Sequence, residues 1–324
     1  MWLGRVPRTL EDMSNYDVAV VGGGAAGLSA ALVLSRARRD VLVLDGGRPR
    51  NAPAAHMQGF LSRDGMPPAE LLAHGRDEVR GYGGRVVTAA VEGITACHKG
   101  GFRVMFSGGH QVTARQVLLA TGLRDELPDI PGLRERWAGD VLHCPYCHGH
   151  EVRDQPLGVI GMTPDAVRYA QIVRQWSDDV VFFAPESMLT ETQRTELVAR
   201  AIGVVEGSVR RLLTTEDRLS GVEMDDGRVI PRDALFVLPR FVPNNDLLVK
   251  LGADLDENGW VRTDANDGVT GVPGLWVAGN LANPRAQVIT AAGEGSAAAI
   301  AMNAALVDDD VRNAVQDFHR GAPV

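Results

Sequence analysis

Cysteine is scarce in this chain, with only three among 324 residues. So few cysteines cannot form the dense disulfide framework of a small secreted fold. Apolar runs are also short, and none reaches the roughly 20 residues that a membrane-spanning helix needs. The sequence therefore predicts neither a disulfide scaffold nor an integral membrane protein.

Positive charge is limited as well. Lysine occurs only at Lys99 and Lys250, and 33 basic side chains stand against 41 acidic ones, for a formal net charge of −8. This balance, without a Lys/Arg cluster, argues against nucleic acid as the main partner. The hydrophobic fraction of 45% and the charged fraction of 23% are typical of a globular chain and exclude a disordered one.

The N-terminal residues lack the apolar stretch of a secretory signal. We expect residues 1–13 to form an irregular leader, with Met13 as an alternative start. A cytoplasmic location follows as the expectation.

A glycine-rich turn links the first predicted strand and helix. The β-branched run at 17–21 enters G-G-G-A-A-G at 22–27, and an Ala/Leu-rich helix continues to about Ala37. A second strand at 41–44 then ends in Asp45. Strand, glycine turn, helix and terminal acid together form the dinucleotide-binding pattern, which a purely structural glycine turn would not require.

The residue types in this turn match the chemistry of a bound dinucleotide. Gly22 permits the tight turn, Gly24 lets a pyrophosphate approach the backbone, and Gly27 lets the helix pack closely on the strand. The free amides of the helix N-terminus stabilise phosphate charge. Asp45 can accept hydrogen bonds from an adenosine ribose.

Two further elements of the same type lie later in the chain. A strand at 116–120 enters Thr121-Gly122, and a strand at 274–278 enters Gly279-Asn280 before an Ala-rich helix that reaches about Leu306. A middle segment repeats the β-α-β pattern, with a strand at 157–161, a helix at 164–176 and a strand at 180–183.

We therefore predict an α/β protein of two Rossmann-like three-layer nucleotide-binding domains, the second inserted into the first. The first domain is discontinuous, at 14–125 plus 245–324. The inserted domain is expected at 126–244 and carries the pair Cys144-Pro145-Tyr146-Cys147.

The Cys-x-x-Cys spacing favours redox or metal chemistry. A structural zinc would need two more ligands, and the close neighbours His143, His148 and His150 cannot readily all face one metal. Redox chemistry is therefore preferred and no metal site is predicted. Cys97 is expected to be a buried small hydrophobic residue.

Taken together, the motifs resemble the low-molecular-weight thioredoxin reductase family of FAD-dependent pyridine-nucleotide disulfide oxidoreductases. These motifs are G-G-G-A-A-G at 22–27, A-T-G at 120–122, C-P-Y-C at 144–147, and A-G-N with A-A-G-E-G within 278–295. The resemblance extends over nearly the whole chain after residue 14. It implies FAD in the discontinuous domain, a redox-active disulfide on the inserted domain, and a homodimer.

Two segments shift the resemblance toward one branch of that family. G-R-P-R-N at 47–51 with H-M-Q-G-F-L-S-R-D-G at 56–65, and the Cys-x-x-Cys-His-Gly-x-Glu form at 144–151, look like the dithiol oxidases of gliotoxin, holomycin and romidepsin biosynthesis. The resemblance implies that Cys147 faces the flavin and that Cys144 exchanges with substrate. His148 takes the place of the reductases' acid and is the candidate proton shuttle, since imidazole titrates near neutral pH.

The residues predicted to contact FAD come from the motifs and from the resemblance. They are Gly22, Gly24, Ala25, Ala26, Gly27, Asp45, Arg50, Asn51, His56, Thr121, Gly122, Gly279, Asn280, Gln287 and Val288. His56 is equally well explained as an ordinary loop histidine. Asn280 stands where the family usually has an Asp that bonds the ribityl chain.

The second glycine turn is degenerate, reading G-M-T-P-D-A at 161–166. Only its first glycine remains, and Thr163 puts a branched side chain where a pyrophosphate would meet the backbone. The following strand continues into Ala184-Pro185-Glu186, without an arginine for a 2′-phosphate. The sequence therefore predicts a site closed to NADPH.

The leading functional hypothesis is an FAD-dependent dithiol oxidase. Its partners would be a small-molecule dithiol and O2, with hydrogen peroxide as the second product. The alternatives are a disulfide reductase that uses NADPH or another electron donor, and a flavin-bearing redox sensor without turnover.

Overall fold

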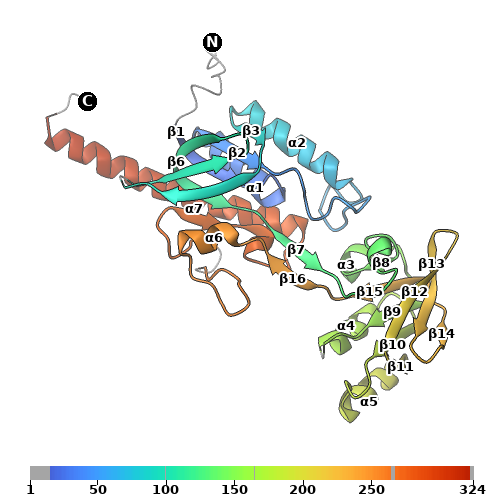
Figure 1. Cartoon of the computed structure of the whole chain (residues 1–324). Coiled ribbons are helices and arrows are strands. Elements are labelled where there is room, and N and C mark those ends of the chain that lie inside the picture. The colour runs from blue at the N-terminus through green and yellow to red at the C-terminus, as the bar shows by residue number, and fades with distance from the viewer. Residues whose placement is uncertain (1–14, 99, 164, 264–266, 322–324) are drawn as a thin grey trace. The chain divides into compact units, whose positions relative to one another are not determined.

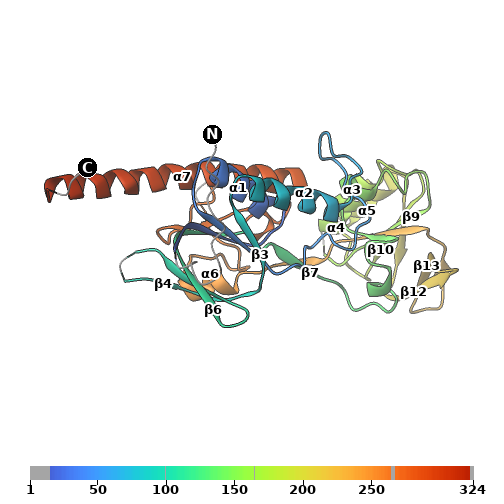
Figure 2. The ribbon, with the colours of Figure 1, turned by 90° about the horizontal axis from the view of Figure 1, so that it is seen from above.

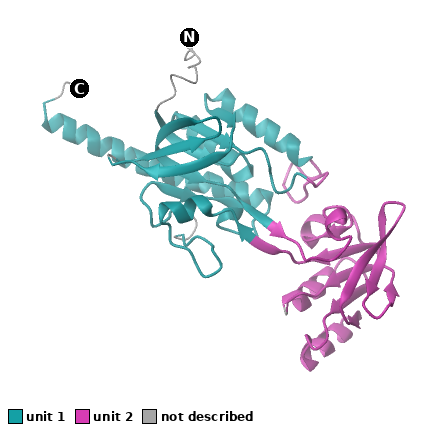
Figure 3. Cartoon of the chain, viewed as in Figure 1, with its two compact units in different colours: residues 1–52, 67–124, 242–324 teal, residues 53–66, 125–241 magenta. Residues whose placement is uncertain are grey.

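The computed structural model describes residues 15–98, 100–163, 165–263 and 267–321 (Figure 1). The predicted leader at 1–13 lies outside these residues. The chain forms two compact units (Figure 3). Unit 1 takes the described residues up to Ala52, then Pro67–Arg124 and the residues from Val242 onward, and unit 2 takes Pro53–Met66 and Asp125–Phe241. In the described part of the chain, no helix combines the length and the hydropathy that a membrane crossing requires.

Unit 1 is built on a seven-stranded sheet with the order β3-β2-β1-β6-β5-β4, in which β17 also pairs with β6. Its strands are β1 (Asn15–Val21), β2 (Val41–Asp45), β3 (Arg85–Thr88), β4 (Val91–Ala96), β5 (Phe102–Phe106), β6 (His110–Leu119) and β17 (Leu275–Val277). Its helices are α1 (Ala25–Arg36), α2 (Pro68–Gly81), α6 (Asp246–Leu251), η3 (Gly279–Leu281) and α7 (Val288–His319).

Strand alternation divides the core of unit 1 into two layers. Val18 and Val20 of β1 face a cluster that holds the buried residues of α1 and α7. Ala19 and Val21 face the opposite cluster, which contains α6 and the β5 side chains. Because successive side chains of a strand point to opposite faces, one apolar run fills both layers. This arrangement produces the predicted three-layer α/β domain.

Strand β6 pairs with neighbours in both the parallel and the antiparallel sense. Its second half pairs in parallel with β1 and with β17, and its first half pairs antiparallel with β5. The parallel strands β1, β2, β6 and β17 therefore end at one edge of the sheet, where open α/β sheets bind ligands.

Helix α7 is longer than the sequence analysis predicted, because it continues beyond Leu306 to His319 (Figure 2). The predicted end was wrong because the last buried apolar residue of α7 is Leu306 and an acidic run, Asp308 to Asp310, follows it. The acidic run interrupts the small-residue and apolar stripe that packs on unit 1, and the prediction followed that stripe.

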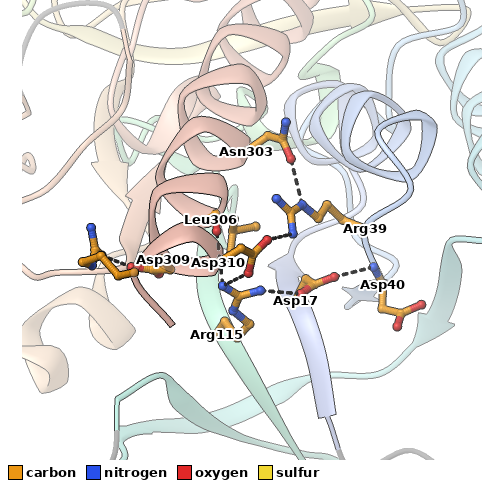
Figure 4. Close-up of polar contacts among 9 residues, drawn as sticks. Asp17, Arg39, Asp40, Arg115, Asn303, Leu306, Asp309 and Asp310 are labelled. Atoms are coloured by element: carbon orange, nitrogen blue, oxygen red, sulfur yellow. Dashed lines mark hydrogen bonds and ion pairs between the residues drawn. The ribbon is translucent and has the colours of Figure 1, made fainter. Parts of the chain in front are cut away.

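A polar network fastens α7 to the strands (Figure 4). Arg115 on β6 bonds Asp17 at 3.1 Å and Asp310 at 2.6 Å. Arg39 bonds Asp310 at 2.8 Å and the side chain of Asn303 at 2.8 Å. These contacts hold the helix as far as Asp310.

Unit 2 contains a five-stranded parallel sheet with the order β11-β10-β9-β15-β8 and an antiparallel sheet β12-β13-β14. The parallel strands are β8 (Val141–Leu142), β9 (Leu157–Ile160), β10 (Val180–Ala184), β11 (Ile202–Glu206) and β15 (Ala234–Val237). The antiparallel strands are β12 (Val209–Thr215), β13 (Arg218–Met224) and β14 (Val229–Ile230), and the helices are η2 (Arg134–Arg136), α3 (Pro145–His148), α4 (Asp165–Val173) and α5 (Glu191–Ala199). A further pair, β7 (Leu123–Glu126) with β16 (Arg240–Pro243), lies where the chain passes between the two units.

The Arg136–Asp140 ion pair lies in the segment before β8, and a hydrogen bond from Leu219 ties it to the start of β13. Both oxygens of Asp140 accept hydrogen bonds from Arg136, at 2.8 and 2.7 Å, and one also accepts from the amide of Leu219 at 2.8 Å. Burial alone would raise the pKa of Asp140, but the bonds from Arg136 and Leu219 outweigh it and hold that pKa below its usual range. Arg136 also bonds Asp217, whose side chain is 99% exposed.

We predict that Asp140→Asn lowers the free energy of unfolding at pH 7 by about 2 kcal/mol, because it removes a half-buried acceptor of charge-assisted bonds. A depressed folded-state pKa stabilises the fold above the unfolded value of about 3.9, and that contribution is lost as pH falls through the folded value. The difference in Tm between wild type and variant, followed by circular dichroism, should therefore shrink below about pH 4. Asp217→Asn is the control and should change stability by under about 0.5 kcal/mol. A constant difference at all pH values would contradict this role.

Candidate active site

The glycine turn after β1 is the most constrained part of unit 1. Gly22 has φ of +108°, and a Cβ atom there would lie 2.3 Å from the carbonyl oxygen of Ala120. A Cβ on Gly27 would lie 1.9 Å from the carbonyl oxygen of Gly22. Only glycine fits either position, so this turn and the start of α1 pack backbone against backbone.

Gly24 differs from its neighbours, since a Cβ there would meet no atom within 4 Å. It is the N-cap of α1, which has neither a side-chain cap nor an acidic residue in its first turn. The amides of this helix terminus are therefore not bonded by a side-chain cap, and the space in front of them is open. Such a terminus stabilises a phosphate group.

Asp45 lies beside this turn at the end of β2. A Cβ on Gly23 would lie 2.6 Å from the Asp45 carboxylate, and that carboxylate accepts a bond from the amide of Gly47 at 3.0 Å. The acid is thus fixed next to the phosphate-binding end of α1, as ribose recognition requires.

The turn after β17 completes this edge of the sheet. Gly279 has φ of +71°, and its amide donates to Glu294 at 3.0 Å. The other oxygen of Glu294 accepts from Asn283 at 2.7 Å. Sequence reasoning gave Glu294 and Asn283 no role, although Glu294 lies within the A-A-G-E-G motif at 291–295. The acid three residues after a small-residue pair was the available signal.

The side-chain amide of Asn280 donates two hydrogen bonds, to the carbonyl oxygens of Asn283 and Ala286, both at 3.0 Å. An ionised aspartate has no hydrogen to donate, so the asparagine holds this loop in a way that the family's usual residue cannot. Its Oδ1 oxygen remains able to accept a bond from a hydroxyl group.

These features fit FAD. Four groups lie on or next to the strand ends of unit 1. They are the open N-terminus of α1, the acid that can bind a ribose, the carbonyl acceptor of Asn280, and the start of α7 at Gln287 and Val288, which has no side-chain cap. FAD would be held by the groups at this edge.

Some predicted cofactor residues have a structural role or lie elsewhere. Thr121 donates to the carbonyl oxygen of Asn244 at 2.9 Å, and the Asn244 amide group donates back to Thr121 at 2.8 Å. These bonds join the segment in which the chain leaves unit 1 to the segment in which it returns. Gly122, with φ of +67°, accepts from the Asn244 amide at 3.0 Å.

Arg50 and Asn51 are half-buried in the turn after β2 and remain predicted cofactor contacts. His56 is exposed and belongs to the 53–66 segment of unit 2. Cys97 follows β4 and is half-buried, so the expectation of a buried residue was wrong.

In unit 2, Cys144 and Cys147 form a disulfide, with their Cα atoms 5.2 Å apart. Cys144 is the N-cap of the short helix α3, and Pro145 occupies its first turn. Among the described residues no cluster of three or more His, Cys, Asp or Glu side chains could hold a metal ion. A disulfide between neighbouring cysteines is the group on which thiol–disulfide exchange acts.

His148 follows the second cysteine directly and is half-buried. Burial lowers its pKa, and the nearby carboxylate of Glu151 partly opposes this. A neutral imidazole beside the disulfide can accept a proton from a thiol at neutral pH.

The other two histidines differ from His148. The ring of His143 stacks on Trp137 at 5.7 Å and meets Phe241 edge-on at 6.1 Å, so it packs among aromatic side chains. His150 is exposed, and its carbonyl oxygen accepts from Arg153 at 2.6 Å.

Gly149 fixes the turn that follows α3. A Cβ at this position would lie 2.6 Å from the indole of Trp176, which also meets Tyr146 edge-on at 5.6 Å. The Cys-His-Gly order therefore places a glycine where α3 packs against Trp176.

The 57–66 loop is tied to this part of unit 2. Gln58 donates to Glu151 at 3.2 Å, and Met57 and Met66 are joined by a backbone bond of 3.0 Å that closes the loop. The loop thus reaches the carboxylate that influences His148. Sequence reasoning noticed the unusual segment but did not predict this contact.

At the second glycine turn, the one remaining glycine packs against the core of unit 2. A Cβ on Gly161 would lie 2.4 Å from the ring of Phe182 and 3.0 Å from the end of Met188. Asp165 occupies the first turn of α4, and Pro185 and Glu186 follow β10. Here the remaining glycine serves core packing, and the helix terminus carries its own negative charge.

Comparison with known proteins agrees with this geometry. Residues 16–295 match the family model described as pyridine nucleotide-disulphide oxidoreductase. The chain belongs to this family. The motif-based assignment, the two-domain α/β fold, the FAD cofactor and an activity as a flavin-dependent thiol/disulfide oxidoreductase are thereby confirmed.

Individual relatives show where in the family the chain stands. It is 29% identical to thioredoxin reductase sirT of Leptosphaeria maculans, over 90% of this chain and 94% of the relative. The crystal structure of HlmI is 53% identical, with a TM-score of 0.91 and coverage of 95% of this chain and 98% of that one. An oxidoreductase from Agrobacterium tumefaciens is 35% identical, with a TM-score of 0.84 and coverage of 90% and 99%.

We predict that Gly24→Val lowers the FAD content of the purified protein well below one per chain. Its stability without cofactor should fall by only about 1 kcal/mol, the cost of a valine at a helix N-cap, because a Cβ at this position meets no atom within 4 Å. Gly27→Ala is the contrasting variant and should lose about 2 kcal/mol of stability, since its methyl group meets backbone. Flavin absorbance and thermal unfolding of the apoprotein separate the two effects. Full flavin in the Gly24 variant would refute the role of this terminus.

We predict that Glu151→Gln moves the acid limb of the rate profile for dithiol oxidation to lower pH. The Glu151 carboxylate raises the pKa of His148, so its neutralisation lowers that pKa and leaves the base unprotonated in more acidic solution. Glu186→Gln removes a charge elsewhere in the same unit and should leave the limb in place. An unchanged limb in the Glu151 variant, or an equal shift in both, would remove His148 from this role.

Proposed function

We propose that this protein is an FAD-dependent dithiol oxidase that closes a disulfide in a small-molecule dithiol. One observation carries the proposal: the Cys144–Cys147 disulfide lies in the unit whose nucleotide turn keeps only its first glycine and is followed by Asp165 in the first turn of α4. The chain thus combines thiol-exchange chemistry with a poor site for NADPH.

The first step is thiol–disulfide exchange. A substrate thiolate attacks Cys144, the S–S bond breaks, and Cys147 leaves as a thiolate. The second substrate thiol then displaces Cys144, which releases the substrate as a cyclic disulfide and leaves two reduced cysteines. His148 accepts the proton of an attacking thiol and later returns one, so the exchange conserves electrons and protons.

Bound FAD supplies a two-electron acceptor that O2 can regenerate, with hydrogen peroxide as the product. The residues of this chain hold it in unit 1 through the α1 terminus, Asp45 and Asn280. Cys147 is the sulfur proposed to face the flavin, and Cys144 the one proposed to face substrate.

The Cys-x-x-Cys-His-Gly-x-Glu form at 144–151, by which the chain resembles the dithiol oxidases of natural-product biosynthesis, supports a natural-product dithiol as substrate. The relative from Leptosphaeria maculans is named a thioredoxin reductase, so the competing function is a disulfide reductase that uses NADPH or another donor. We also propose a cytoplasmic homodimer, as the family resemblance implies.

An anaerobic titration of the flavin absorbance tests the proposal. One sample of the yellow holoprotein receives NADPH and the other a simple dithiol such as dithiothreitol. We expect bleaching with the dithiol alone, and a return of colour with stoichiometric peroxide when air is admitted. Rapid bleaching by NADPH would instead identify a reductase.

We predict that Cys144→Ser and Cys147→Ser each reduce dithiol oxidation to background while FAD stays bound, because exchange needs both sulfurs. Cys97→Ser is the matched control and should retain activity, since Cys97 has no role in the proposed exchange. Oxygen consumption with dithiol measures the rate, and flavin absorbance measures the cofactor. Full activity in either of the first two variants would overturn the mechanism.

A further inference from the structure

Helix α7 has two apolar faces, and only one of them is used within the chain. The first face packs into unit 1 through Ala291, Gly295, Ala298, Ala299, Met302 and Leu306. The second face presents Ile300, Val307, Val311 and Phe318, which are 63%, 45%, 57% and 68% exposed. Ala304 and Ala314 lie between them and are also exposed.

The second face has the spacing of a helix-packing seam. Residues 300, 304, 307, 311, 314 and 318 follow one another at alternating steps of four and three, the repeat by which two helices interlock. We call these six residues the α7 seam. It is about 27 Å long at 1.5 Å per residue.

The positions of the seam residues are symmetric about residue 309. Val307 and Val311 lie at equal distances from position 309, as do Ala304 and Ala314, and as do Ile300 and Phe318. About a two-fold axis, if residue i of one copy contacts residue j of the other, then residue j of the first copy contacts residue i of the second. An antiparallel pair of α7 helices centred at 309 satisfies this requirement with valine against valine, alanine against alanine, and isoleucine against phenylalanine.

The end of α7 has little support from the rest of its own chain. The network around Arg115 and Arg39 ends at Asp310, and every residue from 311 to 321 is exposed. An isolated helix of this length is marginally stable in water, since most helical stability in proteins comes from packing of an apolar face. Figure 2 shows this part of α7 continuing past the sheet of unit 1.

The charges beside the seam are compatible with the same pairing. Asp308 and Asp310 flank the seam and would lie near Asp310 and Asp308 of the second copy. Asp310 already bonds Arg39 and Arg115 at 2.8 and 2.6 Å. Its charge is therefore compensated before the copies meet.

We propose that the α7 seam is the contact between two copies of this chain, packed as antiparallel helices about a two-fold axis near residue 309. This inference rests on the proposed homodimer and names its interface. It is independent of the thiol chemistry, so Cys144→Ser should leave the assembly unchanged even if the oxidase proposal fails.

Sedimentation equilibrium of the holoprotein tests the interface. We expect wild type to be a dimer at micromolar concentration and Val311→Glu to be a monomer. Gln316→Glu introduces the same residue at an exposed position about 140° around the helix from Val311, away from the seam, and should remain a dimer. Full flavin absorbance in all three proteins shows that the fold is retained. A monomeric wild type, or a dimeric Val311 variant, would overturn the proposal.

A charge pair tests the antiparallel register. Ala304→Glu and Ala314→Lys should each weaken the dimer by at least tenfold in Kd, because each buries an unpaired charge. The double variant should recover most of the loss, since the pairing places each introduced glutamate opposite an introduced lysine of the second copy. A parallel pair would instead place like charges together. Failure of the double variant to recover would therefore refute the register.

Discussion

The contact between backbones at the start of α1 is the constraint on which unit 1 depends. Gly27 lies against the carbonyl of Gly22, and Gly295 of α7 lies so close to Ala26 that a Cβ there would be 2.0 Å from its carbonyl oxygen. Two glycines thus allow α1 to touch both the strand below it and the helix beside it. Gly24 lies between these close contacts, yet a Cβ there would meet no atom within 4 Å.

The fold was largely predictable because its main signals are local. The β-branched run before Gly22, the acid at Asp45 and the repeated strand-to-glycine turns define the parallel strands without reference to distant residues. The antiparallel strands around β5 and β13 were not predicted, although β5 alternates buried and exposed residues and most of β13 is buried. The end of α7 was missed because its outward face, Val311 to Phe318, is apolar without being buried in the chain.

The candidate site was predictable only where the residue types and spacing of a motif indicate a particular chemistry. Cys144, Cys147 and the glycines fall in this class. The roles of Glu294, Asn244 and Gln58 depend on partners 15, 123 and 93 residues away in sequence, which no local pattern specifies. Polar residues of this kind are positioned by the tertiary fold, so a single sequence gives their type but not their neighbours.

Helix α7 begins at Val288, two residues after Ala286, whose carbonyl oxygen accepts a hydrogen bond from Asn280, and it continues without a break to His319. Its 32 residues form a rod of about 48 Å at 1.5 Å per residue. One continuous helix thus begins beside the cofactor edge of the sheet and ends, about 48 Å away, in a stretch whose side chains are all exposed.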